Sequence, residues 1–521
     1  MQEEYKRQME QQLCTVAEFV RAKVTTIDRH NYILGLIFFK TLSDRVEWYT
    51  NKWLKKKDIT YAIIIENSPK GEKYLEALKE EILGSLGYFL PPSALFSKIV
   101  TKGNAKDSQD TYILDDLCAA FCGIEQSALG TASEEGFKHL FEDLNFSSTT
   151  LGNTPQQRNA IISEVMAQLN GINFQIDSNG CHDMGDVFEY LIGFIAKGER
   201  HESSGFYTPI EVSKVLAKIV TTGKESLSNI YDPTCGSGSL LLHVAKEVRG
   251  VFGFYGQEVN RINYNLTRMN MILHNVYSDR FDIRQGNSLE DPQHMHLRFE
   301  AIVANPLFMV EWSGNPLLML DKRFRPWGRL APKNKADYAI VQHMLYHLAQ
   351  NGTMAVVLPH GALFRGADEG HIRQYLIKEC NYLDAVIGLP ANILHGSRVS
   401  SCIMVFKKNR VHKDSILFID ASQDYKKEKT HNRLKEVHIT KIVETYRSRE
   451  SQNYYSYAAP INQVAENNYN LNISRYINAF GKEFVVDLDD VSARLKALEK
   501  DLTVMDKTIA DFSKELKIKK S

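Results

Sequence analysis

Apolar and polar positions separate the chain into a first part with helical periodicity and a second part in which short apolar runs alternate with helical stretches. The first part opens with apolar residues at three- and four-residue spacing, the pattern of an amphipathic helix: Val16, Phe19, Val20, Val24 and Ile27. The very apolar segment from Tyr32 to Leu42 is expected to form a core helix. We therefore predict a helical N-terminal domain over residues 1–165.

The second part, which we place at residues 166–480, has the rhythm of an α/β domain. Helical stretches such as Ala336 to Gln350 separate several of its strands, and Gly352 is placed to cap that helix. This order predicts a doubly wound, seven-stranded and largely parallel sheet with helices on both faces. The predicted strands are 228–232, 251–258, 281–285, 299–304, 353–358, 383–389 and 402–407.

The last segment, residues 481–521, is predicted to be a C-terminal coiled-coil helix that binds a partner. Its apolar residues alternate four- and three-residue spacing with charged residues between them, as an a/d heptad seam does: Val491, Leu495, Leu498, Leu502, Met505, Ile509, Phe512 and Leu516. One helix cannot bury such a stripe alone. The seam therefore packs either on a partner's helix or on the N-terminal domain of the same chain.

Composition narrows the class of protein. Lysine and arginine together number 63, and so do aspartate and glutamate, so the formal net charge is zero. The chain thus lacks the basic excess of a stand-alone DNA-binding protein. Its seven cysteines form no C-x-x-C pair, and the N-terminus has no signal-peptide core. The longest apolar run near the N-terminus, Tyr32 to Phe39, is too short to span a bilayer. We expect a cytoplasmic protein without membrane contact.

The stretch from Tyr231 to Leu241 reads as a strand, a tight glycine turn and the start of a helix. Gly236, Ser237 and Gly238 would let the backbone approach a ligand at the helix N-terminus. A dinucleotide pyrophosphate is the usual ligand of such a turn, but Asp232 at the strand tip would repel it and could hold an ammonium group. S-adenosylmethionine, which has an amino-acid end and an adenosine end, suits the turn better.

Two further residues follow the next strands. Glu258 lies about 20 residues after Gly238, the separation at which an acid grips ribose hydroxyls. Asn287, after the third predicted strand, could hydrogen-bond the adenine edge, although an acid is common at that position. These residues extend the candidate cofactor site across three strand ends.

Asn305-Pro306-Leu307-Phe308 follows the strand 299–304 and resembles the Asn-Pro-Pro-Phe/Tyr motif of amino-group methyltransferases. Upstream, the block from Gly205 to Pro209 resembles the cofactor clamp that precedes the glycine turn in one class of DNA adenine methyltransferases. That clamp would include Phe206, Tyr207 and Thr208. The last two either line the methionine end of the cofactor or form a packed aromatic turn.

With these blocks in order, the chain resembles the methylation (M) subunit of type I restriction–modification systems nearly end to end. Other segments that carry the resemblance are 87–89, 186–191, 270–275, 330–338, 364–366 and 372–376. The resemblance implies N6-adenine methylation of double-stranded DNA with S-adenosylmethionine as donor. It also implies assembly with a sequence-reading specificity (S) subunit, usually with two M subunits for each S subunit, and association with a restriction (R) subunit.

Adenine N6 is a poor nucleophile because its lone pair is conjugated into the ring. By resemblance, Asn305 Oδ1 and the Pro306 carbonyl accept its two N–H bonds and free the lone pair without a general base. Phe308 would stack on an adenine flipped out of the duplex. The alternative is a purely structural role, in which Asn305-Pro306 only ends a strand with a turn.

Leu307 stands where the family usually has a second proline, which raises a rival hypothesis. The chain would then be a catalytically impaired assembly subunit that binds cofactor and DNA without methylating. A third hypothesis is a methyltransferase acting on protein glutamine, whose motif is similar, but the N-terminal domain and the heptads count against it.

Two remaining patterns are ambiguous. Six basic residues with aromatics among them lie between Lys322 and Lys335 and suit either phosphate contacts or a solvated loop. The pairs His294/His296 and His343/His347 have metal-like spacing, but no acid or third ligand of the usual kind accompanies them. We expect no metal site.

Overall fold

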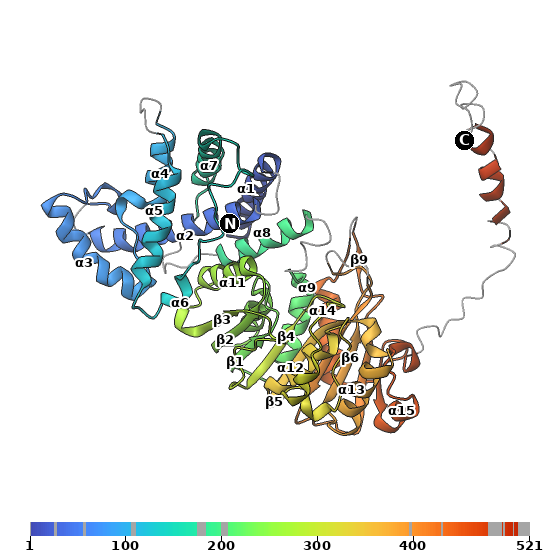
Figure 1. The fold of residues 1–521 in the computed structure, drawn as a ribbon. Coiled ribbons are helices and arrows are strands. Elements are labelled where there is room, and N and C mark those ends of the chain that lie inside the picture. Colours follow the sequence, from blue (N-terminus) through green and yellow to red (C-terminus); the bar gives the residue numbers. More distant parts are fainter. Residues whose placement is uncertain are drawn as a thin grey trace.

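The computed structural model describes residues 2–24, 29–55, 59–105, 111–174, 184–198, 207–394, 399–428 and 431–477, together with part of 492–508. Within these ranges the chain forms a helical first part and an α/β second part, which lie side by side in Figure 1. No helix in the described residues combines the length and the apolarity that crossing a bilayer requires.

The helical first part is built around a long buried helix. The apolar segment from Tyr32 to Leu42 lies within this helix, and its side chains pack in the core, as the sequence predicts. Tyr88 lies against it, and the Tyr88 hydroxyl donates to the Leu42 carbonyl at 2.8 Å. The helices of this part are α1 (Gln2–Lys23), α2 (Arg29–Leu54), α3 (Pro69–Leu86), α4 (Phe96–Gly103), α5 (Leu114–Ala128), α6 (Glu134–Phe137) and α7 (Pro155–Asn170).

A nine-stranded sheet organises the second part, in the order β11-β8-β6-β7-β5-β4-β1-β2-β3. Strand β7 is antiparallel to both of its neighbours and β11 is antiparallel to β8, whereas the other pairs are parallel. The strands are β1 (Leu227–Asp232), β2 (Val251–Glu258), β3 (Phe281–Gln285), β4 (Phe299–Ala304), β5 (Leu348–Pro359), β6 (Leu383–Gly388), β7 (Ser401–Lys407), β8 (Ser415–Asp420) and β11 (Ser456–Pro460). A separate ribbon pairs β9 (Lys426–Lys427) with β10 (Asn432–Arg433).

All seven predicted strands are present, but the predicted count is too low because β8 and β11 extend the sheet beyond β6. The missed strand β8 has a buried apolar interior, Ile416 to Ile419, with the period of neither an amphipathic helix nor a half-buried strand. Strand β11 is short, lies at the sheet edge and ends in Pro460. A proline is tolerated there because it need not donate to a neighbouring strand.

The predicted helix 336–350 is shorter than expected, and the role assigned to Gly352 is wrong. Helix α12 spans Asp337–His347, and Leu348 already begins β5. The pairing register of β4 and β5 shifts between the pairs Phe299–Leu348 and Ala301–Thr353, a stretch that includes Gly352. A Cβ at Gly352 would lie 2.8 Å from the Phe299 carbonyl, so the glycine permits this bulge and does not cap a helix.

Helices cover both faces of the sheet, as predicted. Alternate residues of one strand enter different cores: Ile302 faces one core, and Ala301 and Val303 face the other. The helices that follow the first part are α8 (Met184–Gly198), α9 (Ile210–Val220), α10 (Ser239–Lys246), α11 (Arg261–Leu273), α12, α13 (Ala367–Lys378), α14 (Glu436–Ser448) and α15 (Ile461–Glu466). Helices α9, α10 and α14 contribute to the core of Ala301, and α12 and α13 to the core of Ile302.

The predicted C-terminal helix lies largely outside the described residues. The described residues between 492 and 508 are helical. Four residues of the heptad seam are among them, and their side chains are exposed: Leu495, Leu498, Leu502 and Met505. These four are therefore not packed on the N-terminal part of the same chain.

Candidate functional site

The candidate residues gather at the carboxyl edge of the sheet. Asp232 ends β1, Glu258 ends β2, and Asn305 follows β4 directly. Strand β1 lies between β2 and β4, so these three side chains come from neighbouring strands. The chain order reverses direction here, and ligands of doubly wound folds bind in the crevice at such a reversal.

The glycine turn connects β1 to α10. Gly236 and Gly238 have φ of 55° and 76°, which glycine adopts without the strain that a side chain brings. A Cβ at Gly238 would lie 2.8 Å from Thr267 Cγ2. The glycines therefore serve both the left-handed turn and the close packing of α11 behind it.

Two buried polar side chains of helix α11 hydrogen-bond to the glycine turn. Thr267 Oγ1 donates to the Gly236 carbonyl at 2.6 Å, and Asn270 Nδ2 donates to the Ser237 carbonyl at 2.9 Å. The sequence prediction missed both roles. Both are polar residues in the buried part of α11, but that part also contains Asn265 and Arg268, so polarity alone does not single them out.

Asp232 is fully buried, and one of its carboxylate oxygens has no partner. Oδ1 accepts from Thr234 N–H at 2.9 Å, whereas Oδ2 has no hydrogen bond within the described residues. Burial, and secondarily the charge of Glu258, raises the pKa of Asp232 to about 7. A buried carboxylate with an unused acceptor is costly unless a cation joins it, so the site fits an ammonium group.

Glu258 braces the glycine turn. Its Oε2 accepts from Gly236 N–H and its Oε1 accepts from Asn260 N–H, both at 2.9 Å. Burial raises the pKa of Glu258, and the backbone donors oppose that rise. The side chain of Asn263 also interacts with this carboxylate, and a contact of Glu258 with the hydroxyl groups of a ligand stays a prediction.

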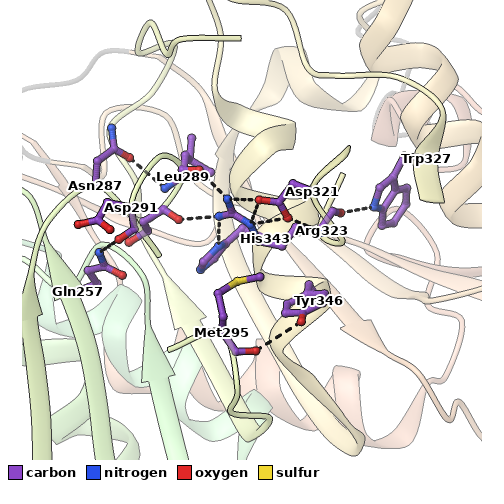
Figure 2. Close-up of polar contacts among 11 residues, drawn as sticks. Gln257, Asn287, Leu289, Asp291, Met295, Asp321, Arg323, Trp327, His343 and Tyr346 are labelled. Atoms are coloured by element: carbon purple, nitrogen blue, oxygen red, sulfur yellow. Dashed lines mark hydrogen bonds and ion pairs between the residues drawn. The ribbon is translucent and has the colours of Figure 1, made fainter. Parts of the chain in front are cut away.

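Asn287 lies in the turn after β3, where Figure 2 shows it beside Leu289 and Asp291. Its Oδ1 accepts from Leu289 N–H at 2.9 Å. The amide N–H groups therefore remain for a ligand, in contrast to the acid common at this position, which would only accept. Ser288 and Leu289, the next residues of the turn, bind a buried arginine.

That arginine is Arg323, the centre of the network in Figure 2. Its guanidinium donates to the Ser288 and Leu289 carbonyls, both at 2.7 Å, and forms an ion pair with Asp321. Arg323 is 1% exposed. The interpretation of the basic segment as phosphate contacts is therefore wrong for Arg323, which is committed inside the protein. The exposed basic residues of the segment are Lys322, Arg325, Arg329 and Lys333.

His343 joins this network to β1. Its Nδ1 accepts from Arg323 at 2.9 Å, and its Nε2 lies 3.0 Å from the Tyr231 hydroxyl. Burial lowers the pKa of His343 well below its ordinary value, and the neighbouring His347 and Arg323 add to that effect. Both ring nitrogens of His343 bind protein atoms. The side chain therefore has a structural role, which accounts for a histidine at this position without a metal ion.

Asn305 is oriented by the upstream clamp. Its Nδ2 donates to Thr208 Oγ1 at 3.1 Å, across 97 positions of the sequence. Its Oδ1 is buried and has no hydrogen-bond partner in the described residues. The sequence assigned Thr208 to the cofactor, but its contact in the structure is with Asn305, which it turns so that the amide oxygen is the free acceptor.

The residues after Asn305 differ in exposure. Pro306 is buried and Phe308 is partly buried against the core, whereas Leu307 is 62% exposed. The leucine side chain therefore leaves the turn and does not fill the space beside Asn305. The predicted stacking of Phe308 on a base stays a prediction.

The two aromatic residues of the clamp have different outcomes. Phe206 lies outside the described residues. Tyr207 is 5% exposed and packs against Gly193 of α8, where a Cβ would lie 2.6 Å from the tyrosine hydroxyl oxygen. Core packing thus accounts for Tyr207, and a contact with the cofactor stays a prediction.

A second group of titratable residues lies between α1, α8, α10 and the end of α11. Asp186, Glu189 and His274 have oxygen and nitrogen atoms within 4.8 Å of one another. Lys6 and Lys246 already form ion pairs with Asp186. These cations balance the carboxylates, so the group is an ion-pair network that ties α1 to the second part.

Comparison with known families identifies both parts of the chain. The N-6 DNA methylase family matches residues 179–483, and the HsdM N-terminal domain matches residues 9–169. The first match contains the glycine turn, Glu258 and the Asn305 tip. The fold and site thus define an adenine-specific DNA methyltransferase.

Relatives give the narrower family. The methylase subunit of the type I restriction enzyme MpnII from Mycoplasma pneumoniae is 33% identical over 535 residues, covering 99% of this chain and 97% of the relative. The crystal structure of a type I restriction–modification methyltransferase subunit from Streptococcus thermophilus is 36% identical. It covers 91% of this chain and 99% of its own, with a TM-score of 0.80. The chain belongs to the methylase subunits of type I restriction enzymes and is a modification subunit.

A third comparison concerns the fold alone. A chain from a study of complex assembly and conformational transition in the type I R-M system is 19% identical. It covers 99% of both chains with a TM-score of 0.61. The arrangement of a helical part followed by a doubly wound sheet is therefore common to proteins of quite different sequence.

Proposed function

We propose that this chain transfers a methyl group from S-adenosylmethionine to adenine N6 in double-stranded DNA. The observation that carries the proposal is the pair of unused buried acceptors on adjacent strands, Asp232 Oδ2 and Asn305 Oδ1. One acceptor suits a cationic amino group of a cofactor, and the other suits an amino group of a substrate. Membership of the N-6 DNA methylase family supports the assignment of that substrate.

The cofactor side uses the three strand ends and the glycine turn. When bound, S-adenosylmethionine supplies an electrophilic methyl group on a sulfonium. Asp232 would accept from its ammonium group, Glu258 from its ribose hydroxyls, and Asn287 would donate to an adenine ring nitrogen. Gly236, Ser237 and Gly238 leave room for this ligand beside the N-terminus of α10, whose free N–H groups face the same edge.

On the substrate side, Asn305 Oδ1 and the Pro306 carbonyl would accept the two N–H bonds of the adenine amino group. Drawing both hydrogens toward acceptors reduces the conjugation of the nitrogen lone pair with the ring. The proton leaves after transfer, so no general base is required before it. Thr208 keeps the Asn305 amide from turning its nitrogen toward the base.

Partners follow from the net charge and the exposed seam. A chain with zero formal charge lacks the basic excess that would favour holding DNA firmly on its own. We propose that a specificity subunit does so and reads the sequence. Residues 481–521 would bind it in an assembly of two M subunits and one S subunit, which a restriction subunit joins. The exposed side chains of Leu495, Leu498, Leu502 and Met505 support a partner's helix over an intramolecular site.

The test is to co-express the chain with its specificity subunit and to sequence the cellular DNA for N6-methyladenine. We expect methylation with the wild-type chain and a loss on the order of 10²–10³ in kcat for Asn305→Ala, as for other polar groups that act at a reacting centre. Asn315→Ala is the matched control, because Asn315 lies in the same loop and caps a different turn. Wild-type complex that methylates no DNA would contradict the proposal and favour an assembly subunit.

A further inference from the structure

The backbone just beyond the catalytic turn has an unusual conformation. Met309 has φ of +56°, in the left-handed region that residues with a side chain rarely adopt. Its N–H donates to Asp337 Oδ1 at 3.1 Å. The residue that follows Asn305-Pro306-Leu307-Phe308 is therefore held by a side chain at the start of α12.

Asp337 is itself fixed. It is 2% exposed, and its Oδ2 accepts from Arg365 at 2.8 Å. The same Arg365 nitrogen lies 3.1 Å from Glu369 Oε1 on α13. The carboxylate thus links the segment after β4 to the segment after β5, and its two oxygens serve different partners.

The backbone around this contact is paired as well. Ala336 N–H donates to the Val310 carbonyl at 2.9 Å, and Trp312 N–H donates to the Lys333 carbonyl at 3.0 Å. The segment that leaves the turn therefore runs beside the segment that enters α12. Among the residues of these two segments that are paired, Met309 is the nearest to Asn305 in the sequence.

Leu307 explains why such a support matters in this chain. A proline at that position would fix φ and restrict the backbone of the turn itself. Leucine does not, so a contact with another part of the chain has to restrict the turn. We propose that Asp337 is the positioning residue of the catalytic turn: by binding Met309 N–H it aims Asn305 and the Pro306 carbonyl in place of the missing proline. This inference rests on the proposed function.

The experiment compares kcat and KM of methyl transfer in the assembled complex for wild type, Leu307→Pro, Asp337→Ala and the double variant. We expect Asp337→Ala to lower kcat by about ten- to a hundredfold, since a displacement of roughly 1 Å has that effect. KM for the cofactor should stay within about twofold, because the cofactor turn is held elsewhere. Leu307→Pro should raise kcat several-fold more in the Asp337→Ala background than in wild type, because it restores the turn from within.

Asp384 provides the matched control. It is as buried as Asp337, forms ion pairs with Arg449 and Arg410, and makes no contact with the turn. Asp384→Ala should lower Tm but leave kcat and the effect of Leu307→Pro unchanged below its unfolding temperature. If Asp337→Ala does not fold, Asp337→Asn is the second variant: its Oδ1 still accepts from Met309 N–H, so its kcat and its response to Leu307→Pro should match those of wild type, and a tenfold loss of kcat in Asp337→Asn would overturn a positioning role through this hydrogen bond.

The outcomes separate the two claims. A methylating wild type with an unchanged kcat in Asp337→Ala, or with an equal effect of Leu307→Pro in both backgrounds, overturns the positioning role alone. A wild-type complex that methylates no target DNA overturns the proposed function and this inference with it.

Discussion

The cofactor half and the catalytic half of the site are held in different ways. Around Asp232, the contacts that shape the turn come from the turn itself, from Glu258 at the end of β2 and from Thr267 of α11, the last two lying 22 and 31 positions after Gly236. Around Asn305, the contacts come from Thr208, 97 positions earlier, and from Asp337, 28 positions after Met309. The cofactor turn is therefore held by the strand and the helix that follow it in the chain, whereas the catalytic tip is held from both sides in the chain, by Thr208 before β1 and by Asp337 at the start of α12.

Removal of the carboxylate at the centre of the cofactor half should have the largest effect on that half. Asp232→Ala takes away the unused buried acceptor, and losing one partner of a buried charge pair costs about 2–5 kcal/mol. We expect S-adenosylmethionine affinity, measured by titration calorimetry, to fall by about thirtyfold or more. Asp384→Ala, which removes an equally buried carboxylate elsewhere, should bind cofactor normally. Equal affinities in wild type and Asp232→Ala would remove Asp232 from the cofactor site.

The raised pKa of Asp232 predicts a pH effect on the ligand-free protein. Between the ordinary carboxyl pKa of about 4 and the value of about 7 in the folded protein, the unfolded chain releases the proton while the folded chain keeps it. The free energy of unfolding should therefore decrease as pH rises through that window. Asp232→Asn cannot ionise, so its Tm advantage over wild type should grow from pH 5 to pH 7. A constant difference would contradict the raised pKa.

Thr208→Val should affect the catalytic half without disturbing the cofactor half. The substitution keeps the shape of the side chain and removes the acceptor for Asn305 Nδ2, leaving a partly buried donor unpaired. We expect kcat to fall by about tenfold, the effect of about 1.5 kcal/mol, at unchanged cofactor affinity. A matching loss of affinity would instead support the assignment of Thr208 to the methionine end.

Leu307→Pro should have the smallest effect. Proline at a compatible position contributes only about 0.4–1 kcal/mol through the unfolded state, and Asp337 already holds the turn. We expect a gain of about two- to fivefold in methyl transfer by the assembled enzyme, with unchanged cofactor binding. An unchanged rate would show that leucine is accommodated without cost, and a loss would show that proline does not fit this turn.

The same contrast explains how much of the molecule was predictable from the sequence. The seven strands, Asp232, the glycine turn and Glu258 follow from apolar runs and short spacings, and the structure places them at one edge. The sequence leaves Arg323 as either a phosphate contact or part of a solvated loop, and neither holds, because sequence alone does not reveal that this guanidinium is buried.

Other features depend on pairings that only the folded chain makes. The sequence predicts Gly352 to be a helix cap. It does not reveal the bulge that requires this glycine, because the bulge forms against Phe299 of a different strand. Thr208 and Asp337 could not be assigned to Asn305 and Met309, since no known spacing rule connects either pair. Strand β8 was missed because a short apolar run alone does not reveal which sheet edge it extends.

The position of β7 has a consequence for biosynthesis. Strand β7 separates β5 from β6 in the sheet, although it leaves the ribosome after both of them. Until residues 401–407 emerge, β5 has one vacant edge and β6 lacks the neighbour that joins it to the growing sheet. Open strand edges recruit other chains. Nascent chains paused between Gly388 and Ser401 should therefore be the most dependent on chaperones and the most prone to aggregate.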